Sequence, residues 1–200
     1  DASTDGKVSK GIGDKPPSIL DEPEGPSLLV ATAHLGTSFL SMGDLETTPQ
    51  ASFSIGAGYP IALGSMTLDV GANVSFTAVN WDSEMSSGTA GLTSLLANAG
   101  VTYPLMDKIN LRGELGAGAF MMSGLDVIGN VFVPEGQVAT GALGSFSVRA
   151  AVAAEYSLNE SLAVNVAPIV LNVASAPDGL RSDIGNISAF QMLLGVGYKM

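Results

Sequence analysis

The sequence predicts an all-β protein: an eight-stranded, antiparallel, up-and-down transmembrane β-barrel. Three observations lead to this fold class. Apolar residues alternate with small or polar ones over most of the chain, which is typical of strands with one face in an apolar medium. Each of the four tyrosines closes such a run. Short and long connections alternate between the runs, as they do in barrels that cross a membrane.

The composition separates the chain from ordinary soluble domains. Only 14% of its 200 residues are charged and its mean hydropathy is +0.36, whereas soluble domains carry about 25% charged residues. Uncharged windows such as 47–68 are long enough for a spanning helix, but this one contains Pro49, Pro60 and many hydroxyls. A spanning helix needs about 20 predominantly apolar residues. If the chain lies in a bilayer, a closed barrel is therefore the structure that satisfies its backbone.

The alternating runs define the predicted strands and their order. The strands cover residues 27–42, 50–60, 65–80, 93–104, 108–122, 144–157, 161–173 and 187–200. The connections are short at 61–64, 105–107 and 158–160, and longer at 43–49, 81–92, 123–142 and 174–186. Pro168 stands in the middle of the seventh run and predicts a β-bulge there, because proline cannot donate to a strand ladder.

Residues 1–26 differ from the rest of the chain. They contain four prolines, six acidic residues and three lysines, with almost nothing apolar. This composition predicts a tail that is either disordered or ordered only on a partner. The chain is thus divided into an acidic, proline-rich tail at 1–26 and a barrel at 27–200.

The tyrosines predict one edge of an aromatic girdle. Amphipathic rings at the same level of every second strand suit a membrane–water interface. The girdle residues are Tyr59, Tyr103, Tyr156 and Tyr198. Both termini fall on the side of the short connections, so we expect the tyrosines to mark the periplasmic rim. Nearer the opposite rim we expect Phe39, Phe76, Phe146, Phe190 and Trp81.

Charged residues of the predicted strands share one face. A charge that faces lipid at mid-bilayer costs roughly 2–4 kcal/mol, whereas an inward one can pair or meet trapped water. The inward set is Asp69, Arg112, Glu114, Arg149, Glu155 and Lys199. Three acids and three bases predict an interior ion-pair network that fills the lumen, because eight strands leave room for little more than side chains. The alternative is a narrow solute path, which the many inward glycines favour.

The alternation, the strand number and the last residues resemble the small eight-stranded bacterial outer-membrane barrels, the family of the OmpA transmembrane domain, OmpX and OmpW. The resemblance covers residues 27–200. Gly195, Tyr198 and Met200 look like the C-terminal signal read by the barrel-assembly machinery, with a glycine, an aromatic residue three later and a bulky apolar end. Family members usually end in Phe, and the position of Leu193 is usually polar. The resemblance implies an outer-membrane location with both termini in the periplasm.

The sequence offers no catalytic, cofactor or metal site. Cysteine is absent and His34 is the only histidine, so no cluster has metal-ligand spacing. His34 falls on the inward face, where a hydrogen-bonded interior histidine is the ordinary case. A lipid-modifying enzyme would need a serine–histidine pair at the lipid face. A soluble lipocalin-like carrier is disfavoured, because its apolar face would point inward.

The long connections are strongly acidic. They carry Asp44, Glu46, Asp82, Glu84, Asp126, Glu135, Asp178 and Asp183, against the single base Arg181. This balance argues against nucleic acid as a partner and leaves lipopolysaccharide, bridged by divalent cations, as a possible contact. We expect a non-enzymatic structural barrel whose loops or tail contact envelope partners, with a narrow channel or carrier as the alternative.

Overall fold

The chain was examined as a computed structural model, which describes residues 29–43, 45–82, 84, 86–126 and 130–200. The predicted tail at 1–26 and Asp44 lie outside these ranges. Within them, no helix combines the length and the apolar character needed to cross a membrane. The strands are β1 (Val30–Met42), β2 (Leu45–Glu46), β3 (Gln50–Leu63), β4 (Met66–Asp82), β5 (Ser87–Met106), β6 (Ile109–Ser123), β7 (Leu143–Ser157), β8 (Leu162–Ala174) and β9 (Ile187–Lys199).

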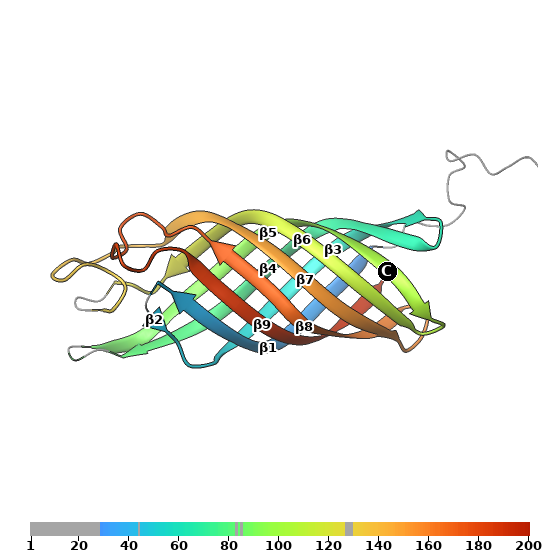
Figure 1. The fold of residues 1–200 in the computed structure, drawn as a ribbon, viewed down its shortest axis with the longest axis horizontal. Coiled ribbons are helices and arrows are strands. Elements are labelled where there is room, and N and C mark those ends of the chain that lie inside the picture. Colours follow the sequence, from blue (N-terminus) through green and yellow to red (C-terminus); the bar gives the residue numbers. More distant parts are fainter. Residues whose placement is uncertain (1–28, 44, 83, 85, 127–129) are drawn as a thin grey trace, which may run out of the picture.

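The sheet closes on itself. Each long strand pairs antiparallel with its neighbours in chain order, and β1 also pairs with β9 from Val30–Lys199 to Met42–Ile187. β2 is a short addition to the end of β1, so the described barrel has eight long strands, β1 and β3 to β9. Figure 1 shows their tilted ribbons forming one cylinder. The predicted fold class and strand order are confirmed.

The largest difference from the predicted bounds is at the start of β5. The sequence placed a long connection at 81–92, but β5 begins at Ser87 and pairs with β4 as far as Asp82. Residues 87–91 are Ser, Gly, Thr, Ala and Gly, so they carry no apolar alternation for a pattern to detect. Their pairing is stabilised by β4, whose Trp81 lies opposite Gly88.

The β-bulge predicted at Pro168 is confirmed. The register of β8 shifts between Ala167 and Val170 against β9, and opposite it between Val152 and Ala154 of β7. The extra residue reverses the side-chain parity of β8. Asn165 and Ala167 are buried before the bulge, and Val170 is buried after it. Regular alternation across this strand would have placed half of its side chains on the wrong face.

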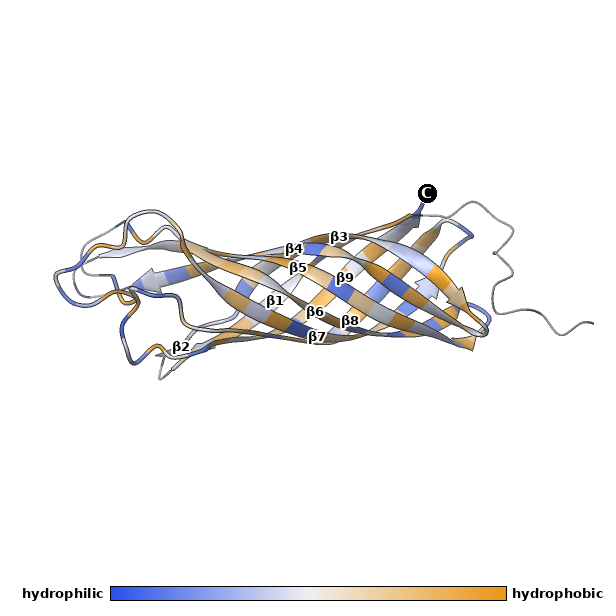
Figure 2. Cartoon of the chain, turned by 90° about the horizontal axis from the view of Figure 1, so that it is seen from above, coloured by the Kyte–Doolittle hydropathy of each residue, from blue (hydrophilic) through white to orange (hydrophobic). Residues whose placement is uncertain are grey.

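The outer wall is apolar and the inner wall carries the charges. Exposed large apolar side chains occur on the outward positions of every long strand, and Figure 2 shows hydrophobic and hydrophilic positions alternating along the ribbons. In the described long strands, the charged residue outside the inward set is Asp82, which ends β4. An apolar outer surface with enclosed charges would be unfavourable in water, so the outer wall is suited to contact with hydrocarbon.

The two ends of the cylinder differ. Short turns join β3 to β4, β5 to β6 and β7 to β8, and both the start of β1 and the end of β9 lie at this turn end. Gly64 adopts φ 62° in the first turn, a left-handed conformation that favours glycine. The connections at 43–49, 124–142 and 175–186 and the tip of the β4–β5 hairpin form the opposite loop end, at the left of Figure 1.

The outer wall gives a first prediction. Leu115 lies in the middle of β6, faces outward and is 68% exposed. In phospholipid vesicles, Leu115→Arg should lower the free energy of unfolding by about 2–4 kcal/mol, and Met121→Arg, near the loop end of the same strand, by clearly less. Denaturant titration of the vesicle-reconstituted variants measures both. Equal penalties at the two positions would contradict a membrane-spanning wall.

Candidate functional site in the barrel interior

The interior is arranged in three levels, which a single strand illustrates. The inward positions of β4 carry Asp69 at the turn end, then Asn73 and Thr77, and finally Val79 and Trp81 at the loop end. The side chains therefore change from charged to neutral polar to apolar along the axis. The sequence alternation that fixes the inward face thus places three chemically different layers inside one cylinder.

Arg112 organises the charged level. Its Nη1 lies 3.0 Å from Asp69 Oδ2 and its Nη2 lies 3.2 Å from Glu114 Oε2. The second oxygen of Glu114 is 3.7 Å from Arg149 Nε. Thr102 also donates its hydroxyl to Asp69 Oδ2, at 3.1 Å. Two guanidinium groups and two carboxylates therefore form one chain of alternating charge from β4 through β6 to β7.

The structure does not bring the whole inward set together. Glu155 accepts a long hydrogen bond of 3.5 Å from Asn110, and Lys199 is exposed at the turn end. Among the described residues, Glu155 pairs with neither arginine and Lys199 pairs with neither Asp69 nor Glu114. The alternation along their strands predicted that Glu155 and Lys199 lie on the inward face. Their position near the open end of the barrel, which parity does not give, leaves them apart from the pairs.

A polar cavity lies beside the charged level. Its wall includes Gly56, Gly58 and Gly71, which leave room that larger side chains would fill, together with Asn98 and Glu155. Four buried polar atoms on this wall have no hydrogen-bond partner among the described residues: His34 Nδ1, Asn98 Oδ1, Arg149 Nε and Asn165 Oδ1. A roomy cavity with such atoms suits bound water.

Gly195 has a packing role that the sequence analysis did not anticipate. A Cβ at this position would lie 2.3 Å from His34 Cδ2 and 2.7 Å from Asn165 Oδ1. The interior therefore excludes any side chain at Gly195. Tyr198 and Met200, the other two residues of the predicted assembly signal, are exposed at the turn end.

All four tyrosines lie at the turn end of the barrel. They belong to every second long strand around the barrel, and their outward side chains are 45–52% exposed. They are Tyr59 on β3, Tyr103 on β5, Tyr156 on β7 and Tyr198 on β9. This placement matches the geometry expected of a girdle.

The middle level is a hydrogen-bonded layer that crosses the lumen. Arg149 Nη1 donates to Asn73 Oδ1 at 3.1 Å, and Asn73 Nδ2 donates to Ser54 Oγ at 2.9 Å. Gln191 Nε2 reaches from β9 to Ser52 Oγ of β3, also at 2.9 Å. Because the bonds of Arg149 and Gln191 join strands that are not neighbours, they fill the lumen as well as bracing its walls.

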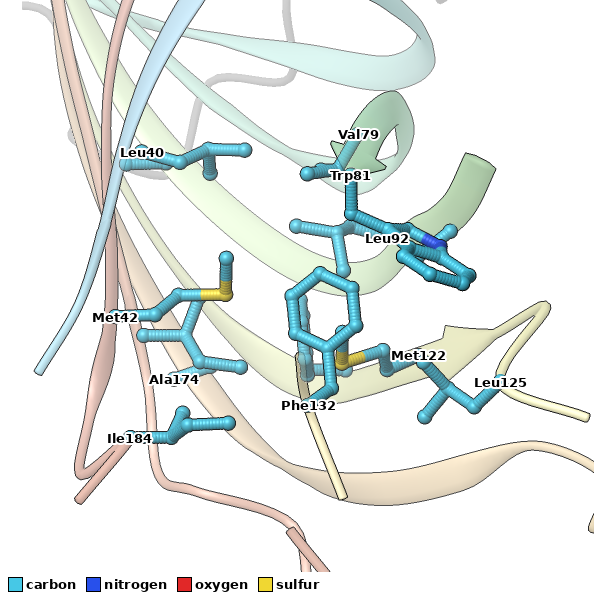
Figure 3. Packing of buried hydrophobic residues seen from close by; sticks show 14 residues of the cluster. Leu40, Met42, Val79, Trp81, Leu92, Met122, Leu125, Phe132, Ala174 and Ile184 are labelled. Atoms are coloured by element: carbon cyan, nitrogen blue, oxygen red, sulfur yellow. The ribbon is translucent and has the colours of Figure 1, made fainter. Parts of the chain in front are cut away.

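The loop end is closed by an apolar cluster that sequence analysis missed. Figure 3 shows its side chains meeting in the interior. Strand residues of the cluster include Leu40, Met42, Val79, Trp81, Leu92, Phe120, Met122 and Ile187, and loop residues include Leu125, Phe132 and Ile184. Trp81 lies at the loop end, as predicted, but its side chain faces inward, and its ring meets that of Phe132 edge-on at 6.3 Å between centroids. The sequence did contain a signal for the strand residues of this cluster, because they continue the alternation that marks the inward face.

Hydrogen bonds hold the loops over this cluster. Asn130 donates to Leu125 O at 2.8 Å and accepts from the backbone N–H groups of Phe132 and Val133 at 3.0 and 3.1 Å. The N–H of Arg181 donates to Phe132 O at 2.9 Å. Two connections distant in sequence therefore lock Phe132 in the mouth of the barrel. Residues 127–129 lie outside the described ranges.

Comparison with known proteins supports the fold. No protein-family model matches the sequence, and a comparison with curated proteins finds no match. Neisserial surface protein A is structurally similar, with a TM-score of 0.64 at 12% identity over 86% of this chain and 97% of that one. Ail, the attachment invasion locus protein of Yersinia pestis, in complex with the heparin analogue sucrose octasulfate, gives 0.55 at 12% identity over 87% and 99%.

The outer membrane enzyme PagL is also similar, with a TM-score of 0.50 at 13% identity over 83% of this chain and 97% of that one. Identities this low show the fold alone. The chain therefore has the fold of the small bacterial outer-membrane β-barrels, as the resemblance implied. The names of the similar structures cover an enzyme and surface proteins, so the fold does not select an activity.

The charged level gives a second prediction. Arg112→Met would leave Asp69 and Glu114 without their nearest cation and should cost about 3 kcal/mol of stability. Combined with Asp69→Asn, the loss should be smaller than the sum of the single losses by about 1–3 kcal/mol. Denaturant unfolding in detergent micelles measures the cycle. The control pair, Arg112→Met with Lys199→Met, should be additive because Lys199 takes no part in the ion pairs around Arg112; additivity in the Asp69 cycle would contradict the network.

Proposed function

We propose that this chain is a non-enzymatic structural barrel of the bacterial outer membrane, with a lumen closed to solutes and contacts made by its loops or its tail. The observation that carries the proposal is the filling of the lumen above the charged level. The hydrogen-bonded layer crosses the lumen from β7 to β4 through Arg149 and Asn73. Above it, the cluster residues are at most 7% exposed.

These two layers disfavour the channel alternative on physical grounds. A hydrated solute would have to break the bonds of the middle layer and then lose its own water among Phe132, Trp81 and Met122. Burying a polar group without a partner costs roughly 2–7 kcal/mol. The polar cavity beside Arg112 suits bound water beneath these two layers.

The loop end supplies a charged outer surface for contacts. Its described carboxylates include Asp82, Glu84, Asp126, Glu135 and Asp178. Asp183 is exposed, and the hydrogen bond from Arg181 lowers the pKa of its carboxyl. The rim therefore stays negative at neutral pH. We place this end outside the cell and both termini in the periplasm, as is usual when long loops oppose short turns. Divalent cations would then bridge the rim to lipopolysaccharide.

An enzymatic role has little support in the geometry. The only histidine, His34, lies in the interior cavity, where a substrate in the membrane does not reach it. In the described part of the chain, no group of three or more acidic or histidine side chains is placed to hold a metal ion. The proposal therefore assigns the chain a scaffold role.

Conductance measurements test the proposal. The purified barrel should produce no discrete current steps in planar lipid bilayers across the usual voltage range, because the apolar cluster excludes hydrated ions. A general porin measured in the same membrane is the positive control, and heat-modifiable migration on a gel confirms that the sample is folded. Reproducible unit steps from the folded barrel would overturn the closed-lumen reading and favour a narrow channel.

A further inference from the structure

The lipid-facing wall is hollowed over β5 to β8 by an apolar groove of about 610 Å³, which we call the outer groove. Gly113 and Ala150 lie on its floor. Larger apolar residues form its sides, namely Val101 and Leu115 on one side and Val152 and Leu171 on the other. These four side residues are 43–68% exposed, so the groove offers a free apolar surface to whatever surrounds the barrel.

The outer groove runs along the barrel axis because of the offset between the strands. Cross-strand partners, followed once around the barrel from Ala31, lead back to β1 at Ser41, ten residues nearer the loop end. The strands therefore tilt, as Figure 1 shows, by roughly 35–45°. A step to the partner on the next strand, followed by two residues toward the loop end, consequently rises almost parallel to the axis.

Three rows of outward side chains follow this axial direction. The floor row takes one residue each from β5, β6 and β7, namely Tyr103, Gly113 and Ala150. The rows on its two sides are Val101, Leu115 and Val148, and Leu111, Val152 and Leu171. Above Tyr103, a floor of small residues between two ridges of branched side chains thus forms a trough parallel to the membrane normal.

The packing of the barrel itself does not require glycine at position 113. A Cβ there would meet no atom within 4 Å, which is true of no other glycine in the described strands. The φ of Gly113 is not positive, so its backbone conformation does not require glycine either. A glycine inside a strand weakens the strand and often marks a place where a ligand or another backbone approaches closely. Gly113 therefore points to an occupant outside the barrel.

The surroundings of the outer groove select a hydrocarbon chain as this occupant. The groove is continuous with the exposed apolar wall that faces lipid, and its long direction is the direction of lipid chains. Glu114 also borders the groove, but its carboxylate pairs with Arg112 in the lumen. A second barrel would present a convex wall, which would rest on the ridges without reaching Gly113, whereas a single chain is narrow enough to lie between them.

We propose that one acyl chain of a phospholipid, in the leaflet nearer the turn end, lies in the outer groove over Gly113 and Ala150, with its ester end at Tyr103. Tyr103 belongs to the girdle, at the level where headgroups begin. The chain gains no apolar burial, since the bilayer is as apolar as the groove; it gains dispersion contacts with the floor and both ridges. Valine side chains have few rotamers, so the ridges keep their shape. This lipid site goes beyond the scaffold role and does not depend on whether the lumen conducts.

A photoreactive lipid tests the proposal. The barrel is reconstituted in phosphatidylcholine vesicles that contain a small fraction of phosphatidylcholine with a diazirine halfway along one acyl chain. After irradiation and digestion, mass spectrometry maps the labelled residues. Labelling of 111–115 and 148–152 should exceed that of 53–59, the outward-facing reference segment of β3, several-fold, because a chain held in the groove stays beside those residues.

Two substitutions that fill the floor are compared with a matched control. Gly113→Leu and Ala150→Leu should each reduce labelling of the groove segments to the level of β3. Ala57→Leu adds the same side chain to the outer face of β3 at a similar depth, because Ala57 lies two residues from Tyr59 and Gly113 lies two residues from the partner of Tyr103. This control should leave labelling of the groove unchanged. Heat-modifiable gel migration verifies that each variant is folded.

Equal labelling of the groove and of β3 in the unmodified barrel overturns the proposal, since ordinary lipid contact would account for it. Labelling of the groove below that of β3, with barrel dimers trapped by cross-linking in the same vesicles, would overturn it in favour of a second copy. Groove labelling that persists in whichever floor variant folds would contradict it as well.

Discussion

The constraint on which the whole structure depends is that hydrocarbon offers backbone groups no hydrogen-bond partners. A sheet in such a medium has to close, and the pairing of β1 with β9 over the full length of β1 does so. Closure divides every strand into an outward and an inward set of side chains. The outward set then has to be apolar, and the charges of the described long strands lie on the inward side, apart from Asp82 at the loop end of β4.

The same confinement explains why the interior is layered. Charges near the turn end pair around Arg112 beside a polar cavity. Neutral polar groups such as Gln191 satisfy one another across the middle, and apolar side chains close the loop end together with Phe132. In each layer, contacts among the side chains of that layer offset the free-energy cost of removing them from water.

Much of the fold followed from the sequence, because period-2 alternation reports directly on which face meets lipid. The strand order and the inward parity of Arg112 derive from that signal, whereas the bulge was predicted from Pro168, which cannot donate to a strand ladder. The alternation signal fails where the side chains on both faces of a strand are small, as at the start of β5. It also does not tell how far along the barrel axis an inward residue lies. The prediction therefore included Glu155 in an ion-pair network that it does not join, and it placed Trp81 at the correct rim without its packing inside the barrel. The packing of Phe132 in the apolar cluster could not be predicted from the sequence, because Phe132 lies in a loop and a loop has no periodic pattern.

The central claim is that lipid touches one side of each strand and the lumen the other. The chain has no cysteine, so single-cysteine variants along β4 can carry a spin label in lipid vesicles without background. Labels at Val70 and Val74 should collide readily with oxygen, which concentrates in hydrocarbon, whereas labels at Asn73 and Ser75 should not. If labels at Asn73 and Ser75 collided with oxygen while labels at Val70 and Val74 collided with a water-soluble relaxing agent, the lipid-facing and lumen-facing sides would be exchanged. That result would contradict the structure described.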